Sequence, residues 1–167
     1  MDYIIRDAKK NDMKSVLKLI QELALFEREP DEVIITEDQL IKDGFYGHPK
    51  FKCFVAEIES EVVGIALLYP RYSTWKGHAM HLEDLIVTEK HRGKGIGFAL
   101  FSKFIKYSHD LNVKRVQWVV LDWNTSAIDF YKKNGAIILD DWRVALMDDK
   151  AIQKSVSYTH LTLPTKA

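Results

Sequence analysis

Residues 85–97 read Leu85-Ile86-Val87-Thr88-Glu89-Lys90-His91-Arg92-Gly93-Lys94-Gly95-Ile96-Gly97. An apolar run typical of a buried strand leads into a loop of alternating glycines, and the spacing of the apolar residues beyond it predicts a helix. Glycine lets backbone N–H groups crowd around an anion, and the N-terminus of a helix adds a partial positive charge. Because Arg92 and Lys94 add charge at the same place, the pattern favours a bound phosphate or pyrophosphate. A plain strand-to-helix turn is the alternative.

Two common nucleotide motifs fit this loop poorly. The dinucleotide fingerprint needs a glycine at position 98, where the chain has Phe98. The phosphate loop of nucleoside triphosphatases needs Ser or Thr directly after its Gly-Lys pair, where the chain has Gly95, and glycine at position 88, where it has Thr88. A plain nucleotide-binding module is therefore a weak interpretation.

Outward from the loop, the apolar periodicity predicts one mixed α/β domain. Helices are expected at 13–23, 36–43, 97–108 and 124–134, and strands at 3–7, 51–58, 62–69, 78–87, 115–121 and 142–147. Residues 155–167 lack the charged, periodic character of the preceding sequence. We expect them to be a doubtful, non-native tail, with residues 1–154 forming the domain.

Composition narrows the class of protein. The 24 basic and 24 acidic side chains balance, without the basic excess typical of nucleic-acid binding, so no nucleic-acid partner is expected. No signal peptide is visible at the N-terminus and no apolar run is long enough to span a membrane, which predicts a cytoplasmic protein with no membrane partner. The single cysteine, Cys53, is interpreted as a buried apolar residue, and the scattered histidines predict no metal site.

Arg92-x-x-Gly95-x-Gly97 resembles the acetyl-CoA pyrophosphate motif of the GNAT acetyltransferase superfamily. From about Tyr3 to about Met147 the chain is most similar to the spermidine/spermine (diamine) and thialysine N-acetyltransferase group. The further matching stretches are Gln21-Glu22-Leu23-Ala24, Thr36-Glu37-Asp38, Asp43-Gly44-Phe45, His48-Pro49, Leu82-Glu83-Asp84, Asp122-Trp123-Asn124 and Phe130-Tyr131-Lys132-Lys133-x-Gly135-Ala136.

The resemblance implies a single α/β (α+β) domain with a mixed central sheet and flanking helices. Two parallel strands, here 78–87 and 115–121, would splay apart to admit the pantetheine arm of acetyl-CoA. The backbone groups of residues 85–87 would form hydrogen bonds with this arm and polarise the thioester carbonyl. The implied cofactor-binding residues are Leu85, Ile86, Val87, Arg92, Gly93, Lys94, Gly95, Ile96, Gly97, Phe98, Asn124, Thr125, Ser126 and Ala127.

The chemistry of acetyl transfer needs help with two protons. An aliphatic ammonium has a pKa near 10.4, so forming the free amine at pH 7 costs roughly 4–5 kcal/mol, and a nearby base is useful. The resemblance implies Glu83 for that role and Tyr131 as the general acid for the leaving thiolate. Taken singly, Glu83 could instead be a strand-end charge paired with a lysine, and Tyr131 a half-buried aromatic residue.

The resemblance also implies an acidic pocket for a cationic substrate, with two departures from the family pattern. Phe26 replaces the usual tyrosine, and Ser73-Thr74-Trp75 replaces Asp-Pro-Trp, which removes one carboxylate and weakens the case for spermidine or spermine. A shorter diamine or a lysine-like amino acid stays open, and Leu121-Asp122-Trp123-Asn124 leans toward the thialysine branch. The implied substrate-binding residues are Phe26, Glu27, Trp75, Glu83, Asp84, Gln117, Trp118 and Val119.

Together these patterns predict an enzyme that transfers acetyl from acetyl-CoA to a primary amine of a small cationic metabolite. The alternatives are a protein or peptide N-acetyltransferase and a non-catalytic acyl-CoA-binding sensor domain. By the same resemblance, the protein is expected to form a homodimer.

Overall fold

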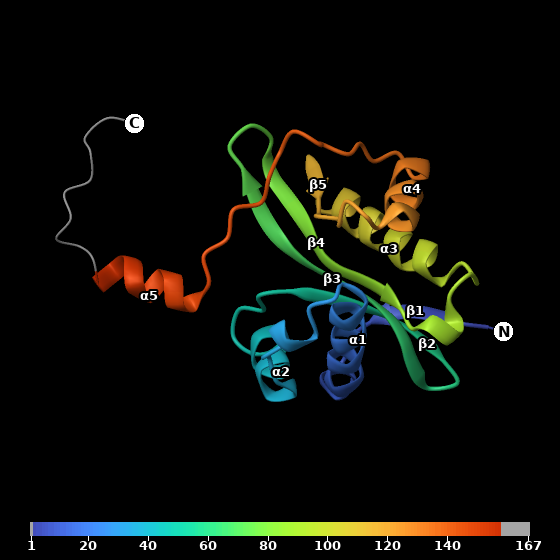
Figure 1. Cartoon of the computed structure of the whole chain (residues 1–167). Coiled ribbons are helices and arrows are strands. Elements are labelled where there is room, and N and C mark those ends of the chain that lie inside the picture. Colours follow the sequence, from blue (N-terminus) through green and yellow to red (C-terminus); the bar gives the residue numbers. More distant parts are fainter. Residues whose placement is uncertain (1, 158–167) are drawn as a thin grey trace. The chain divides into compact units, whose positions relative to one another are not determined.

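The computed structural model describes residues 2–157, and the chain divides into two compact units, Met1–Leu121 and Asp122–Ala167. In the first unit, the described residues form a five-stranded sheet in the order β1-β2-β3-β4-β5 (Figure 1). All neighbouring strands are antiparallel except β4 and β5, which run parallel. The strands are β1 (Ile4–Asp7), β2 (Lys52–Ile58), β3 (Glu61–Ser73), β4 (Gly77–Val87) and β5 (Arg115–Gln117).

Helices cover both faces of this sheet (Figure 1). One face carries the first two α-helices, and α3 lies on the other face. Alternation along β2 shows this division, because Phe54 meets Tyr107 of α3 edge-on while its neighbours Cys53 and Val55 join the core against α1. The helical segments are α1 (Met13–Phe26), α2 (Glu37–Phe45) and α3 (Ile96–Asp110), with short 3-10 turns η1 (Lys10–Asp12), η2 (Pro30–Glu32) and η3 (Glu89–His91).

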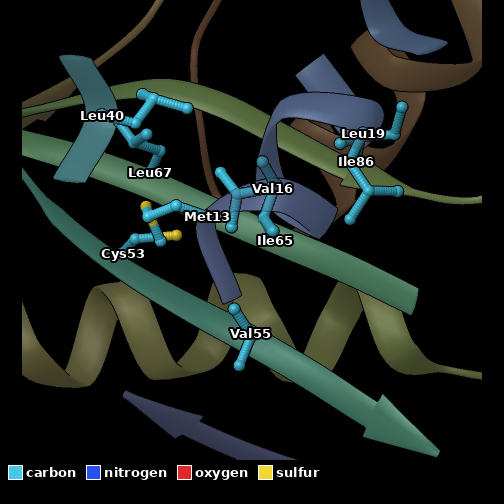
Figure 2. Close-up of a cluster of buried hydrophobic side chains, with 9 residues drawn as sticks. All are labelled: Met13, Val16, Leu19, Leu40, Cys53, Val55, Ile65, Leu67 and Ile86. Carbon is cyan, nitrogen blue, oxygen red and sulfur yellow. The ribbon is translucent and has the colours of Figure 1, made fainter. Parts of the chain in front are cut away.

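The core on the α1 face joins residues that are far apart in the sequence. Figure 2 shows Met13 and Val16 of α1 packed over Cys53, Ile65 and other apolar side chains. Each fully buried aliphatic side chain stabilises the fold by roughly 1.5–3 kcal/mol. Cys53 is part of this core, and burial raises the pKa of its thiol well above the ordinary value. The interpretation of Cys53 as a buried apolar residue is therefore confirmed.

The register of β3 and β4 is interrupted at one position. Leu67 lies opposite Asp84 and Leu68 lies opposite Leu82, so within this described ladder no β3 residue faces Glu83. Such a β-bulge redirects a side chain, and bulges are frequent beside active sites. Glu83 is thus the position at which the otherwise regular pairing of β4 with β3 is interrupted.

The parallel strands separate after three residue pairs. β5 pairs with β4 from Ala79–Arg115 to His81–Gln117, and within the described residues the ladder ends there while β4 continues to Val87. The splayed parallel strands are confirmed, but the expected strand 115–121 is too long. Trp118 turns toward α3 instead, where its ring packs edge-on against Phe101 and Phe104.

The second unit contains α4 (Thr125–Lys133) and α5 (Asp149–Ser157). The expected strand 142–147 is wrong, because residues 136–148 form no strand or helix in the described chain. Its alternating apolar residues suit a strand, but a strand also needs a hydrogen-bonded neighbour, and Trp142, Val144 and Leu146 stay exposed. Of the expected tail, 155–157 belong to α5, and 158–167 lie outside the described residues.

The other predicted elements are present with small changes of length. β3 runs four residues beyond the predicted end, and α2 continues past Gly44 to Phe45. The Thr36 hydroxyl oxygen accepts from the Gln39 N–H at 3.2 Å and caps α2 as the sequence predicts. In the described part of the chain no helix is both long and apolar enough to cross a membrane.

Candidate active site

A cavity of about 310 Å³ lies between the end of α1, the segment 29–35 and the bulge of β4. Its walls are apolar where Ile20, Leu23 and residues 33–35 line it. Its polar groups are carboxylates, and among the described lining residues none is Lys or Arg. A site with this balance suits a small molecule that carries positive charge and a short apolar stem. The five carboxylates belong to Glu27, Glu29, Glu32, Glu83 and Asp84.

Three of these carboxylates influence one another. Burial, with the negative charges of Glu83 and Glu27 as smaller causes, raises the pKa of Asp84 to about 7. Burial also raises the pKa of Glu27, and the charge of Glu83 adds to the rise. Like charges in a partly desolvated site disfavour full ionisation. A bound cation would relieve this repulsion, so the electrostatics of the cavity favour an ammonium ligand.

Glu83 occupies the bulge, with its side chain about half exposed (51%). Its carboxylate lies 3.6 Å from His81 Nε2. Burial, with the nearby Glu83 carboxylate as a smaller cause, raises the pKa of Tyr69 to about 12. Sequence reasoning did not single out Tyr69 or His81. The spacing of His81 and Glu83 along one strand could have indicated a role for His81. Nothing in the sequence indicated that Tyr69 lies across the sheet from it.

The glycine loop after β4 has the backbone conformation that an anion site requires. Gly93 and Gly95 have φ angles of +73° and +79°, in the left-handed region that favours glycine. Gly95 is the N-cap of the 15-residue helix α3, whose first N–H groups lack helical partners and carry the positive end of the helix dipole. The residues present therefore fit a pyrophosphate group, as the sequence predicts. Lys94 lies in the same loop, with its ammonium 3.3 Å from His91 Nδ1.

Arg92 connects this loop to the end of α1. Its Nε donates to the Val87 carbonyl at 2.8 Å, one of its terminal nitrogens lies 3.5 Å from a Glu22 oxygen, and its guanidinium lies 5.8 Å from the centre of the Phe26 ring. Glu22 also accepts from the Thr88 hydroxyl at 2.8 Å. Sequence reasoning matched Glu22 to the family but assigned it no role. The structure shows it holding the start of the loop against α1.

The edge of β4 next to the loop is open to a ligand. Because the β4–β5 ladder ends at His81, residues 85–87 have no β5 partner among the described residues. They are held from the other side by β3, where Gly64, Ile65 and Ala66 lie opposite them. An unpaired edge of this kind presents backbone N–H and C=O groups that an extended ligand can bond.

The predicted substrate residues divide into two groups. Glu27, Glu83 and Asp84 line the cavity together. Five others are not among its lining residues: Phe26, Trp75, Gln117, Trp118 and Val119. The Phe26 ring lies near Arg92, and Trp75 is exposed in the turn between β3 and β4 with the Arg115 guanidinium 5.9 Å from the centre of its ring.

The remaining predicted residues belong to the second unit. The Asn124 side chain caps α4, where its Oδ1 accepts from the Ala127 N–H at 3.2 Å. Thr125 and Ser126 form the first turn of the same helix. Tyr131 is buried on α4, with its ring edge-on to Phe130 at 5.4 Å. The cap that the sequence predicted is thus present, with Tyr131 about two turns further along the helix.

The comparisons with known proteins agree with this geometry. Residues 13–136 match the acetyltransferase (GNAT) family. The chain belongs to this family. It is 43% identical over 141 residues to a thialysine N-epsilon-acetyltransferase of Bos taurus, which covers 80% of this chain and 83% of that protein. It is 33% identical over 147 residues to a human spermidine/spermine N(1)-acetyltransferase-like protein 1, covering 83% of this chain and 21% of that protein.

Solved structures show the same fold. An integron cassette protein from the mobile metagenome of V. cholerae superposes with a TM-score of 0.76 at 24% identity, over 93% of this chain and 98% of that protein. The chain therefore has the single GNAT fold with its mixed sheet and flanking helices, and it is an acetyltransferase. Acetyl-CoA is the acetyl donor of this family.

Proposed function

We propose that this GNAT acetyltransferase moves the acetyl group of acetyl-CoA to a primary amine of a small cationic metabolite. The observation that carries the proposal is the carboxylate-lined cavity, which lies directly before the open edge of β4. Its volume is at the lower end of the range for small-molecule sites, which favours a compact amine. A thialysine- or lysine-like amino acid, or a short diamine, fits this size and charge. The identity to thialysine N-epsilon-acetyltransferases supports the first of these.

In the proposed mechanism, Glu83 takes the proton of the substrate ammonium, directly or through a water. Forming the free amine at pH 7 costs roughly 4–5 kcal/mol, and a base beside the ammonium offsets part of this cost. Asp84 and Glu27 attract the cation and hold it beside Glu83. When acetyl-CoA is bound, it supplies the carbonyl carbon that the amine attacks and the thiolate that leaves. Backbone groups of residues 85–87 orient the thioester and stabilise charge on its oxygen.

Two further groups complete the proposed site. The loop residues Arg92 to Phe98 bind the pyrophosphate, chiefly through backbone N–H groups at the start of α3. Asn124, Thr125, Ser126 and Ala127 contact the pantetheine arm, and Tyr131 donates the proton that the leaving thiolate needs. A tyrosine that is protonated at pH 7 can donate in this way. We do not assign Trp75 to the substrate, because Arg115 already lies near its ring.

The experiment is an amine panel with purified protein and acetyl-CoA, read as thiol release. The panel contains thialysine, lysine, ornithine, putrescine, cadaverine, spermidine, spermine and a short lysine peptide, with Tyr131→Phe as the variant. The proposal is supported if the protein acetylates one small amine and the rate of this reaction is lower in Tyr131→Phe. Turnover of the peptide alone points to a protein acetyltransferase. Acetyl-CoA binding without turnover of any amine points to a sensor domain, and no acetyl-CoA binding overturns the proposal.

We also propose that the protein forms a homodimer in the cytoplasm. The exposed apolar side chains of Ile137, Trp142, Val144 and Leu146 support the first part, because a second copy could bury them. Analytical ultracentrifugation tests it, and a monomer at micromolar concentration would contradict it. The cytoplasmic location stays a prediction of the sequence.

A further inference from the structure

Tyr69 and His81 form a stacked pair beside Glu83. They lie directly opposite each other on β3 and β4, with ring centres 5.0 Å apart and an angle of 25° between the planes. Only 8% of His81 is exposed. Its Nε2 lies 3.6 Å from a Glu83 oxygen, and the same carboxylate lies near enough to the Tyr69 hydroxyl to contribute to the rise of its pKa. Two polar groups on a rigid aromatic pair thus face one carboxylate.

The position of this pair in the sheet allows it to orient the Glu83 carboxylate. His81 is the last β4 residue that pairs with β5, opposite Gln117, and Glu83 follows two positions later on the bulge. A half-exposed glutamate on a bulge has several rotamers open to it. The stacked pair, by contrast, is fixed by strand pairing on both sides of His81. It is therefore able to select one orientation of the Glu83 carboxylate.

Packing alone does not explain why a histidine, with its second ring nitrogen, occupies position 81. Within residues 2–157 no hydrogen-bond partner reaches its buried Nδ1. Burial lowers the pKa of His81, with Glu83 opposing and Arg71 assisting this change, so the imidazole is neutral at pH 7. A neutral imidazole has one donor and one acceptor nitrogen, and the negative Glu83 carboxylate 3.6 Å from Nε2 favours the proton on that nitrogen. A buried polar atom without a partner costs folding free energy, which an aromatic ring without nitrogens would avoid.

We propose that Tyr69 and His81 are positioning residues that hold the Glu83 carboxylate toward the cavity for proton removal from the amine. This inference rests on the proposed role of Glu83. In the step concerned, the ammonium N–H bond breaks and its proton passes to a Glu83 oxygen and then to water. The freed nitrogen electron pair forms the bond to the acetyl carbon, the carbon–sulfur bond of the thioester breaks, and the leaving thiolate takes the proton that Tyr131 donates in the proposed mechanism. Tyr69 and His81 keep their protons and act only by orienting the carboxylate.

The test uses two replacements of His81 that differ in which nitrogen they mimic. The amide of His81→Gln can place a donor near the position of Nε2, whereas the shorter His81→Asn reaches only the region of Nδ1. Tyr69→Phe keeps the ring and removes the hydroxyl. His78→Asn, at an exposed histidine on the same strand, is the matched control. The measurements are kcat, KM for amine and for acetyl-CoA, and the melting temperature.

We expect His81→Asn and Tyr69→Phe to lower kcat by about tenfold, a part of what general base catalysis contributes. His81→Gln should recover most of that loss, KM for acetyl-CoA should stay within about twofold, and the Gln and Asn variants should change the melting temperature by similar amounts. Equal kcat values in Gln and Asn variants, or a kcat loss that follows the melting temperature, would overturn the proposal. If the Asn variant does not fold, a Tyr69→Phe variant with wild-type kcat overturns it.

Glu83→Gln separates this inference from the function on which it rests. If Glu83→Gln is inactive while Tyr69→Phe and His81→Asn keep wild-type kcat, the base role stands and the positioning role falls. If Glu83→Gln keeps wild-type kcat, the base role fails and the positioning role fails with it.

Discussion

The glycine loop and the acidic cavity lie on either side of residues 85–87 along the chain, and they are built in different ways. The loop is made by neighbours in sequence, and its positive character comes from backbone amides and a helix end. The cavity collects carboxylates from α1, from the segment 29–35 and from β4, and its character comes first from their burial and then from their mutual repulsion. In the proposed function, the opposite signs of the two regions would separate an anionic cofactor from a cationic amine, with the open β4 edge between them.

The largest effect should come from the residue where cavity and open edge meet. Glu83→Gln keeps the shape of the side chain but removes the base, so kcat should fall by about 10²–10⁴. Acetyl-CoA affinity, measured by calorimetry, should be unchanged because the loop is untouched. Glu59→Gln, in the exposed β2–β3 turn, is the matched control. A parallel loss of acetyl-CoA affinity would show that the two regions do not work separately.

The loop can be disturbed without disturbing the cavity. In Gly93→Ala the left-handed backbone becomes strained by roughly 1–2 kcal/mol, and relief by turning the amides away should weaken acetyl-CoA binding about tenfold. Gly47→Ala provides the control, since Gly47 also has a positive φ of +59° and, like Gly93, open space around an added Cβ among the described residues. Both variants should lose similar stability in thermal melts. If Gly93→Ala and Gly47→Ala bind acetyl-CoA with equal affinity, the proposal that the loop binds its pyrophosphate is contradicted.

The electrostatic cost of the cavity should be visible in the pH dependence of stability. Asp84 titrates near 7 in the folded protein and near 3.8 when unfolded, so the folded state holds more protons between these values. Stability from this group is therefore greatest at low pH and is lost as pH rises from about 4 to about 7. Asp84→Asn removes this loss, so its melting temperature relative to wild type should rise by roughly 6–13 °C between pH 4.5 and pH 8.

Asp38→Asn, at an exposed position of α2, is the control for that comparison. Its melting temperature relative to wild type should not vary with pH in the same window. If Asp84→Asn also shows a difference that is constant with pH, burial and repulsion do not raise the pKa of Asp84 in the cavity.

The smallest effect is expected at Trp75. The side chain is 74% exposed in the β3–β4 turn and is not among the cavity-lining residues. Trp75→Ala should therefore leave KM for the amine within about twofold, as for most surface substitutions. Steady-state kinetics with the amine identified in the panel are the measurement. A tenfold rise in KM would place Trp75 at the substrate after all and extend the site beyond the cavity.

The amino-acid sequence alone determined the features that depend on near neighbours. The glycines at 93 and 95, the helix that follows them, and the caps at Thr36 and Asn124 are local, because each depends on the backbone conformation of a few adjacent residues. The buried character of Cys53 also followed from its strand-like surroundings. The backbone conformation of the loop and of the helix caps could therefore be predicted from the sequence alone.

Only the tertiary structure decided the features that depend on register and on partners. Pairing between β3 and β4 placed Tyr69 opposite His81 and left Glu83 on a bulge, which no periodicity of either strand alone specifies. Burial beside two other carboxylates set the pKa of Asp84. The apolar alternation at 142–147 predicted a strand that does not form, because a strand is completed by hydrogen bonds to a neighbour and not by its own side chains.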